Sequence, residues 1–480
     1  MDAPRRQRRE LRRAGARKDG GGIDSCAILA ILAILTWREA AADYDGFSMK
    51  NTNLLLAIVC FVSGAVQAAA PTPEILVTAL KGMQWQVRYD FAQPVDKLEF
   101  KSSPDDSRGR TWLPDQGFEI VTTDRGEVAR RKDGAQFRTV RFRMSPTYID
   151  LPKEYAPFSP FGDGGMLFHT GRYFACADRC PDDASWSMYL SAGTEDRIIL
   201  NGKTMKAQAH WIDKEDGRSI YVGNNTPQQT KDFIAVLDTA LPERIRGQLL
   251  AQLPEFMHLF SAKLGAIPTR PMLFVSYDVS HPKGWGRQGG VLPGQVFIHF
   301  YGAKWPAEME KPGFADELAW HFVHETAHLY QRTTSTTKGD EWITEGAADA
   351  FAAIALRAKA SEYVKSEEEK ARAKCREVLK GRSVRDAISA GTFDAAYSCG
   401  MLINLAIDSK VRAATKQDGL YAVWRDYLKR PGHIGSAVSK DAYLEAASAV
   451  GGADIAKWVE KAVSEPGANL ILDGAEAIRK

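Results

Sequence analysis

The chain has 480 residues, of which 44% are hydrophobic, 26% charged and 10% aromatic. This composition is typical of a globular protein with two or three domains, and it excludes collagen-like, coiled-coil and wholly disordered chains. The 63 basic and 60 acidic residues leave a formal charge of +3, far from the concentrated positive charge of a nucleic-acid-binding protein. We therefore expect no nucleic-acid partner.

The excess positive charge lies entirely in the first 68 residues, which contain ten basic and seven acidic side chains. There, Met49 starts a short charged segment, which is followed by an apolar run over 54–62 and by small residues up to Ala68. These three features in this order are typical of a secretory signal peptide. We therefore predict a signal peptide over 49–68 and an exported protein, periplasmic or secreted, with no stable membrane span in the mature chain.

Residues 1–48 precede this predicted signal peptide, although a signal peptide normally starts a chain. A misassigned start codon is the interpretation that we favour. The alternative is that the Arg-rich start and the apolar stretch 26–37 form a membrane anchor or a first export signal.

Four cysteines follow Ala68, an even number that suits an oxidising compartment. They allow three disulfide connectivities, and their spacing favours Cys176 with Cys180 and Cys375 with Cys399. The short gap between Cys176 and Cys180 is also compatible with a metal site, but no second Cys or His pair lies near Cys180.

The part of the chain between residues 69 and 225 is predicted to be a β-sandwich-like domain. Short β-rich runs alternate there with turns rich in Asp, Gly, Pro and Asn. The runs are 84–89, 136–143, 187–190 and 197–200.

A polar segment over 223–231 is the expected linker to a second domain. The apolar spacing from Phe233 onward then predicts a helix, and two later runs, 271–279 and 295–300, predict strands. From about Phe314 to the end, the pattern is almost entirely helical.

Inside this helical region, His324, Glu325 and His328 form a His-Glu-x-x-His motif. Residues four apart lie on one face of a helix, so the two imidazoles can bind one Zn²⁺ together. Glu345 begins a second helical run and can supply a carboxylate ligand, which leaves the fourth tetrahedral position for water. Asp349, one turn later, can accept the free ring N–H of a ligating histidine. The alternatives are a helix with two incidental histidines and a solvated Glu345.

These residues resemble the gluzincin zinc metallopeptidases, in the branch of aminopeptidase N and leukotriene A4 hydrolase. That branch follows His-Glu-x-x-His with Trp-x-x-Glu-Gly, as in 342–346, at a gap that is usually a little longer than here. Its later Tyr-x-x-Gly motif is similar to 397–400. The resemblance covers the order of elements from Phe233 to the C-terminus, and the β-rich region matches the sandwich that precedes the catalytic domain in this branch.

The resemblance implies a role for each residue of the motifs. His324, His328 and Glu345 are expected to hold one Zn²⁺ per chain, with Glu325 as general base and then acid. Tyr397 is expected to donate a hydrogen bond to the oxyanion of the tetrahedral intermediate. Without the resemblance, Tyr397 is more simply a packing aromatic residue.

The sequence departs from the branch at one place. Aminopeptidases of this branch have Gly-x-Met-Glu-Asn on a loop before the active-site edge strand, and its glutamate anchors the free amine of the substrate. The corresponding residues here are expected to contact substrate but include no carboxylate; they are Gly290, Val291, Leu292, Pro293 and Gly294. We expect the backbone of 296–300 to pair with an extended peptide by strand addition.

The predicted fold is therefore α+β: the N-terminal sandwich-like domain, a mainly helical thermolysin-like catalytic domain over 226–365, and a helical C-terminal part over 366–480 that completes the active site. The predicted function is an exported zinc metallopeptidase that hydrolyses peptides or proteins through a metal-activated water. One alternative is hydrolysis of a non-peptide substrate at the same metal, and another is a non-catalytic binding protein that retains the zinc. The sequence does not determine the oligomeric state.

Overall fold

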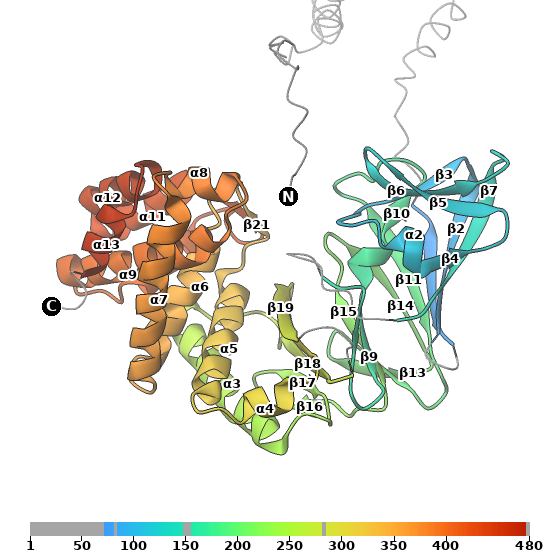
Figure 1. Cartoon of the computed structure of the whole chain (residues 1–480), viewed down its shortest axis with the longest axis horizontal. Helices are drawn as coiled ribbons and strands as arrows, with labels where there is room; N and C mark the ends of the chain where they lie inside the picture. Colours follow the sequence, from blue (N-terminus) through green and yellow to red (C-terminus); the bar gives the residue numbers. More distant parts are fainter. Residues whose placement is uncertain (1–71, 81–83, 147–154, 281–284, 477–480) are drawn as a thin grey trace, which may run out of the picture. The chain divides into compact units, whose positions relative to one another are not determined.

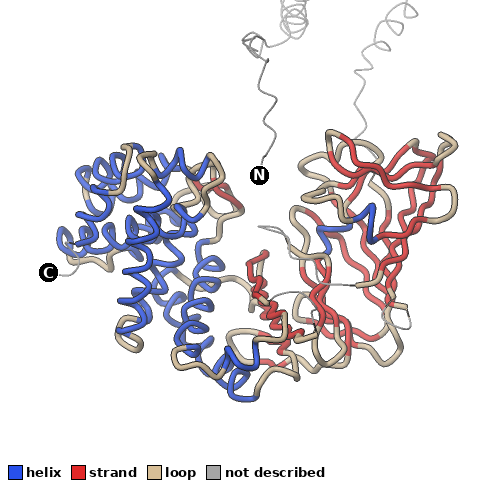
Figure 2. Tube along the Cα trace, in the orientation of Figure 1, coloured by secondary structure: helices blue, strands red, loops and turns tan. Residues whose placement is uncertain are grey.

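The computed structural model describes residues 72–80, 84–146, 155–280 and 285–476, which belong to one compact unit, Ala69–Lys480. The predicted signal peptide and the segment before it lie outside the described residues. Strands are concentrated in the first part of the described chain and helices in the last part (Figures 1 and 2). This arrangement confirms the predicted α+β class with a β-rich part before a helical part.

The β-rich part consists of short strands, as the spacing of the apolar runs predicts. In the strand over Trp85–Val95, the buried residues Trp85, Val87, Tyr89 and Phe91 alternate with more exposed ones, which is the period of a strand with one face in a core. The strands are β1 (Glu74–Ala79), β2 (Trp85–Val95), β3 (Lys97–Phe100), β4 (Trp112–Pro114), β5 (Phe118–Thr123), β6 (Gly126–Arg131), β7 (Phe137–Met144), β8 (Phe158–Pro160), β9 (Met166–His169), β10 (Ala175–Cys176), β11 (Ser185–Ser191), β12 (Arg197–Leu200), β13 (Lys203–Lys206), β14 (Gln208–Lys214) and β15 (Ser219–Gly223).

These strands form three sheets around a common hydrophobic core. The sheets have the orders β14-β11-β1-β2-β7-β4, β10-β3-β6-β5 and β13-β12-β15-β9-β8. Two short helical segments, α2 (Arg108–Thr111) and η1 (Thr170–Tyr173), connect strands of this part.

A five-stranded sheet follows, and it carries the candidate site at its edge. Its order is β16-β17-β18-β20-β19, with β17, β18 and β20 parallel and β19 antiparallel to β20. The elements are β16 (Gln228–Gln229), β17 (Ile234–Leu237), helix α3 (Glu243–Leu264), β18 (Met272–Asp278), β19 (Gly286–Leu292) and β20 (Gln295–Tyr301).

Two predictions for this region are wrong. The helix expected from Phe233 onward is instead β17, a run of four buried residues, and α3 begins only at Glu243. A short continuous apolar run buried on both faces cannot be distinguished from a helix by periodicity. The expected edge strand over 296–300 is β20, which pairs with β18 on one side and β19 on the other and has no free edge for a peptide.

The edge strand is β19, which contains part of the segment predicted to be a loop. Gly290, Val291 and Leu292 lie in β19, whereas Pro293 and Gly294 form the turn to β20. The glycines give this strand a low intrinsic β-propensity, and its pairing with β20 holds it in the sheet.

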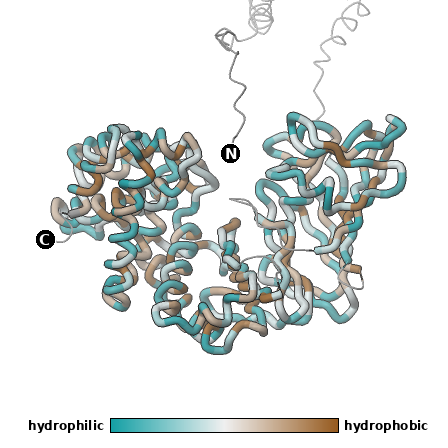
Figure 3. The backbone as a smooth tube through the Cα atoms, in the orientation of Figure 1, coloured by the Kyte–Doolittle hydropathy of each residue, from teal (hydrophilic) through white to brown (hydrophobic). Residues whose placement is uncertain are grey.

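The rest of the described chain is mainly helical, as the sequence predicts, apart from two short strands that pair with each other. Hydrophobic and hydrophilic residues alternate every few positions along these helices (Figure 3). The elements are α4 (Trp305–Met309), α5 (Phe314–Gln331), β21 (Ser335–Thr336), α6 (Thr344–Leu356), α7 (Ser361–Leu379), α8 (Val384–Ser389), α9 (Asp394–Thr415), α10 (Leu420–Lys429), β22 (Ala437–Val438), α11 (Lys440–Gly451), α12 (Ala453–Ser464) and α13 (Asn469–Glu476). In the described residues, we find no helix with the length and apolarity that crossing a membrane requires.

Both favoured disulfides are present. Cys176 is joined to Cys180 next to β10, and Cys375 on α7 is joined to Cys399 on α9. The second bridge joins α9, which carries Tyr397, to the charged helix α7.

Candidate functional site

The His-Glu-x-x-His motif lies in the second half of α5. The apolar side of this helix, including Leu318, Phe322 and Leu329, is buried in the core, and this packing fixes the rotation of the helix. His324 and His328 are therefore held on one side of α5, four residues apart.

Glu345 lies in the first turn of α6, and its position depends on close packing between α6 and α9. A Cβ added at Gly346 would lie 2.3 Å from the main-chain carbon of Gly400, so neither helix tolerates a side chain at this contact. The glycines after Glu345 and after Tyr397 thus allow the two helices to approach, which brings Glu345 and Tyr397 to the same site.

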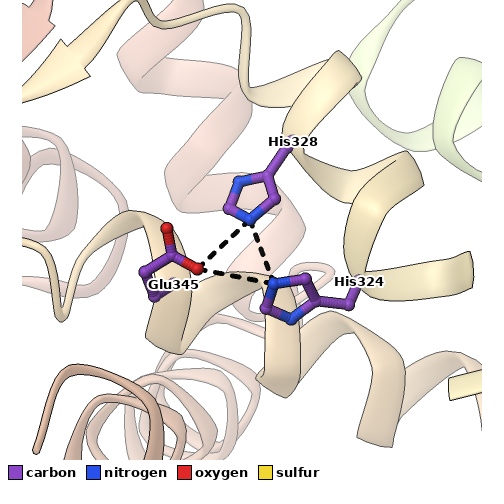
Figure 4. A group of neighbouring side chains, drawn as sticks. All are labelled: His324, His328 and Glu345. Atoms are coloured by element: carbon purple, nitrogen blue, oxygen red, sulfur yellow. Dashed lines mark hydrogen bonds and ion pairs between the residues drawn. The ribbon is translucent and has the colours of Figure 1, made fainter. Parts of the chain in front are cut away.

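The three expected ligands converge on one point (Figure 4). His324 Nε2 lies 3.1 Å from His328 Nε2, and each of these atoms lies 3.4 Å from Glu345 Oε2. A tetrahedral zinc centre with bonds of about 2.0–2.1 Å separates its ligand atoms by about 3.3 Å. The two nitrogens and the oxygen therefore have the spacing that a zinc ion needs.

The other ring nitrogens of the two histidines have partners. His324 Nδ1 lies 2.9 Å from Asp349 Oδ1, which also accepts a hydrogen bond from Trp320 Nε1 at 3.1 Å. His328 Nδ1 lies 2.8 Å from Gln331 Oε1. Because these oxygens accept hydrogen bonds, both Nδ1 atoms are assigned protons, and both Nε2 atoms face the metal position.

Gln331 is itself held by the helix that carries the third ligand. Its Nε2 donates to the main-chain oxygen of Thr344 at 2.9 Å, and its side chain is fully buried. The amide of Gln331 thus connects α5 to the start of α6.

The charges within the ligand group stabilise one another. Burial disfavours the charged form of Glu345, but the imidazoles of His328 and His324 outweigh it and hold the pKa of this carboxyl well below its usual range. Burial also disfavours protonated His324, but Asp349 and Glu345 raise its pKa well above the ordinary value. Because a metal ion and a proton compete for the same Nε2 atoms, acid is expected to weaken metal binding.

Glu325 has a different environment from Glu345. It is buried, and burial raises its pKa even though the neighbouring imidazoles of His324 and His328 oppose the rise. Its Oε1 lies 3.9 Å from Nε2 of His321, one turn earlier on α5. A carboxylate with a raised pKa is a better proton acceptor than an ordinary glutamate.

Tyr397 faces the same group from α9. Its ring lies 6.1 Å from the ring of His324, and 37% of its surface is exposed. Burial and the carboxylates of Glu345 and Glu325 raise the pKa of this phenol far above its ordinary value. The hydroxyl therefore keeps its proton and is able to donate a hydrogen bond.

A cavity of about 570 Å³ opens above the ligands. The edge strand β19 and a hydroxyl-rich segment after α5, residues 333–336, both line it. Its lining residues are Tyr155, Arg287, Gln288, Gly289, Gly290, Val291, His324, Glu325, His328, Thr333, Thr334, Ser335, Thr336, Thr344, Glu345 and Tyr397.

Two of the five residues predicted to contact substrate line this cavity, and three do not. Gly290 and Val291 line the cavity. Leu292 is buried, and Pro293 and Gly294 are exposed at the turn beyond the end of the strand.

Sequence reasoning missed three residues of the site. Gln331 and Trp320 lie three residues after His328 and four before His324, so helical spacing alone could have suggested them. Tyr155 lines the cavity from the β-rich part, 136 residues before the residue that it contacts, and no local pattern marks it.

Neither a known protein family nor a curated protein matches the chain by sequence. Among solved structures, the chain is similar to a two-domain M1 zinc metallopeptidase, a glutamate-to-alanine mutant bound to L-arginine, with a TM-score of 0.50 and 16% identity over 83% of this chain and 94% of the other. It is also similar to native yeast LTA4 hydrolase, with a TM-score of 0.52 and 10% identity over 83% of this chain and 68% of the other. Yeast LTA4 hydrolase in complex with bestatin gives a TM-score of 0.50 at 11% identity. The chain therefore has the fold of these M1 zinc metallopeptidase and LTA4 hydrolase structures.

Proposed function

We propose that this chain is an exported zinc metallopeptidase that cleaves peptide bonds. The observation that carries the proposal is the convergence of His324 Nε2, His328 Nε2 and Glu345 Oε2 beside a buried carboxylate, in a cavity bounded by a free strand edge. Two imidazoles and one carboxylate are a donor set of catalytic zinc sites.

Within the described part of the chain, this is the one cluster of three potential ligands, so we propose one Zn²⁺ per chain. When bound, the ion supplies a Lewis acid that lowers the pKa of water and polarises the scissile carbonyl. Asp349 and Gln331 hold the two imidazoles in the tautomer that this role requires.

Glu325 is proposed to be the general base and then the general acid. It lies on α5 between the two histidines and next to β19, where a Cβ added at Gly289 would lie 3.3 Å from Glu325 Oε1. Its carboxylate can accept the proton of the attacking water and pass it to the leaving amine.

Tyr397 is proposed to stabilise the oxyanion. Its phenol stays protonated, and it enters the cavity from the side of His324. A donor aimed at developing negative charge in a buried site contributes on the order of 3 kcal/mol to transition-state binding.

A peptide is the proposed substrate because β19 is the edge strand of its sheet and lies beside Glu325. An extended peptide can add to such an edge through main-chain hydrogen bonds. The space also continues past the metal position: a second cavity of about 540 Å³ shares Arg287, Gly289 and Glu325 with the first.

The test is cleavage profiling of a broad peptide library with the wild type and with Glu325→Gln, at equal zinc content. We expect cleavage by the wild type and almost none by the variant, because the variant keeps the metal ligands and loses the proton acceptor. A zinc-loaded wild type that cleaves no peptide, or a variant that cleaves as fast as the wild type, would contradict the proposal.

Export is tested separately by N-terminal sequencing of the mature protein. The two disulfides are compatible with an oxidising compartment. The expected first residue is Ala69, and a mature N-terminus before residue 49 would contradict the proposed signal peptide.

A further inference from the structure

The free edge of β19 offers few main-chain groups to a substrate. Leu292 and Gln295 are paired residues that flank the two-residue turn, so their main-chain groups close the hairpin. In an antiparallel ladder, alternate residues direct their N–H and C=O groups away from the partner strand. Val291, Gly289 and Arg287 are therefore the residues of β19 whose main-chain groups face the open side.

One of these three positions is already occupied by the β-rich part. The hydroxyl of Tyr155 donates to the main-chain oxygen of Val291 at 2.8 Å. The ring of Tyr155 packs on Phe297 of β20, with centroids 5.2 Å apart, and on His169 of β9, with centroids 4.9 Å apart. The ring is thus held at the free edge by contacts to both parts of the described chain.

Gly290 makes room for this ring. A Cβ at Gly290 would lie 2.6 Å from Cε1 of Tyr155 and 3.1 Å from Cε1 of Phe297. Any other residue at position 290 would displace Tyr155 from the strand, so the glycine and the tyrosine fit each other.

Tyr155 also separates two cavities. It lines the catalytic cavity, and it lines a cavity of about 310 Å³ in the β-rich part, bordered by Lys101, Arg172 and His169. On the opposite side of Glu325, around Arg287, lies the cavity of about 540 Å³ that shares Arg287, Gly289 and Glu325 with the catalytic cavity. The cleft along β19 is therefore closed at one end by Tyr155 and continues at the other.

We propose that Tyr155 determines substrate length by ending strand pairing on β19 at Gly289. Gly289 and Val291 are two residue steps apart on the strand, about 7 Å, so about two substrate residues fit between the base Glu325 and the Tyr155 ring. The proposal rests on the proposed peptidase function. It adds a limit on the number of substrate residues on one side of the cleaved bond.

The test uses two series of peptides that contain one cleavable bond, lengthened one residue at a time at the N-terminal or at the C-terminal end. For the wild type, kcat/KM is expected to fall on the order of tenfold once the peptide passes about two residues on one side only, because the longer chain loses one or two main-chain hydrogen bonds. Tyr155→Ala is expected to remove this fall by joining the two cavities. Tyr155→Phe keeps the ring and loses the bond to Val291, so its fall should be smaller than that of the wild type but still present.

Two controls keep the result specific. Tyr189→Ala removes a tyrosine of β11 that does not line the cavity, and it should leave the length profile unchanged. Binding of the same peptides to Glu325→Gln, measured by fluorescence anisotropy, gives a readout that does not depend on turnover. All variants are compared at equal zinc content and equal far-ultraviolet circular dichroism.

A length limit on one side, in cleavage or in binding, that Tyr155→Ala removes would support the proposal. If both peptide series are cleaved equally well at every length, the proposal is overturned and the peptidase function stays intact. A length limit that persists in folded Tyr155→Ala has the same consequence. If the wild type cleaves nothing while the length limit appears in binding, the peptidase function fails and the role of Tyr155 stands. A chain that binds and cleaves none of the peptides would contradict both.

Discussion

Replacing Asp349 by alanine is expected to weaken zinc binding more than any other change outside the ligands themselves. Asp349 Oδ1 accepts from His324 Nδ1 at 2.9 Å and from Trp320 Nε1 at 3.1 Å. In Asp349→Ala, both donors lose this partner, and the ring of His324 loses the group that fixes its orientation.

The size of the expected loss of zinc affinity depends on whether the hydrogen-bond partner of the histidine is charged or neutral. Loss of an outer hydrogen-bond partner of a metal-binding histidine costs about 10- to 100-fold in metal affinity. Charge-assisted hydrogen bonds are roughly twice as strong as neutral ones. We therefore expect about 100-fold for Asp349→Ala, and about 10-fold for Gln331→Ala, which removes the neutral amide partner of His328.

The assay is competition for zinc between the protein and a chelator of known affinity, at pH 7.5. Asp349→Asn is the matched control, because it keeps the size and one acceptor oxygen while it removes the charge, and it should lie between the wild type and Asp349→Ala. If Asp349→Ala binds zinc as tightly as the wild type, or if Gln331→Ala has the larger effect, the reasoning from partner charge is wrong.

Three further predictions concern other parts of the chain. Tyr397→Phe should lower kcat by on the order of 100-fold with little change in zinc affinity, because it removes one donor to the oxyanion; steady-state kinetics with metal analysis checks this, and an unchanged kcat would contradict it. The Cys375→Ser/Cys399→Ser double variant should lose about 3 kcal/mol of unfolding free energy in urea, since the bridge spans a sequence separation of 24; equal stability with and without the bridge would contradict this value. Burial, reinforced by the nearby Arg172 charge, lowers the pKa of His169 to about 3, so the folded state binds fewer protons than the unfolded state between pH 6.5 and 3, and stability falls as the pH falls through this range. Between pH 6.5 and 4.5 in a chelator, His169→Gln should therefore lose about 2–3 kcal/mol less than the wild type, and parallel losses would contradict this assignment.

The approach of the two histidines of the motif was predictable because their spacing is local. Two histidines four residues apart on a helix necessarily lie on one face, and the core packing of α5 leaves that face toward the cavity. Glu345 was proposed as a ligand from its place at the start of the next helical run, whereas the role of Tyr397 required the resemblance. Nothing in the immediate sequence indicates that α6 and α9 meet at Gly346 and Gly400. The chemical roles of all these residues stay predictions, as do the domain boundaries near residues 225 and 365.

The edge of the sheet was not predictable in the same way. The sequence of β19 is rich in glycine, so its strand conformation depends on pairing with β20, and the more typical strand sequence of β20 was mistaken for the edge. Likewise, β17 is buried on both faces, which removes the alternation that identifies a strand. Tyr155 reaches Val291 across 136 residues, a contact that only the folded chain reveals.

The most direct test of the account is anomalous scattering at the zinc absorption edge from crystals of the mature protein grown with zinc. We predict one strong peak per chain within about 2.0–2.2 Å of His324 Nε2, His328 Nε2 and a Glu345 carboxylate oxygen. A peak at other residues, or no peak at this position in crystals soaked with excess zinc, would contradict the metal centre on which the proposed function depends.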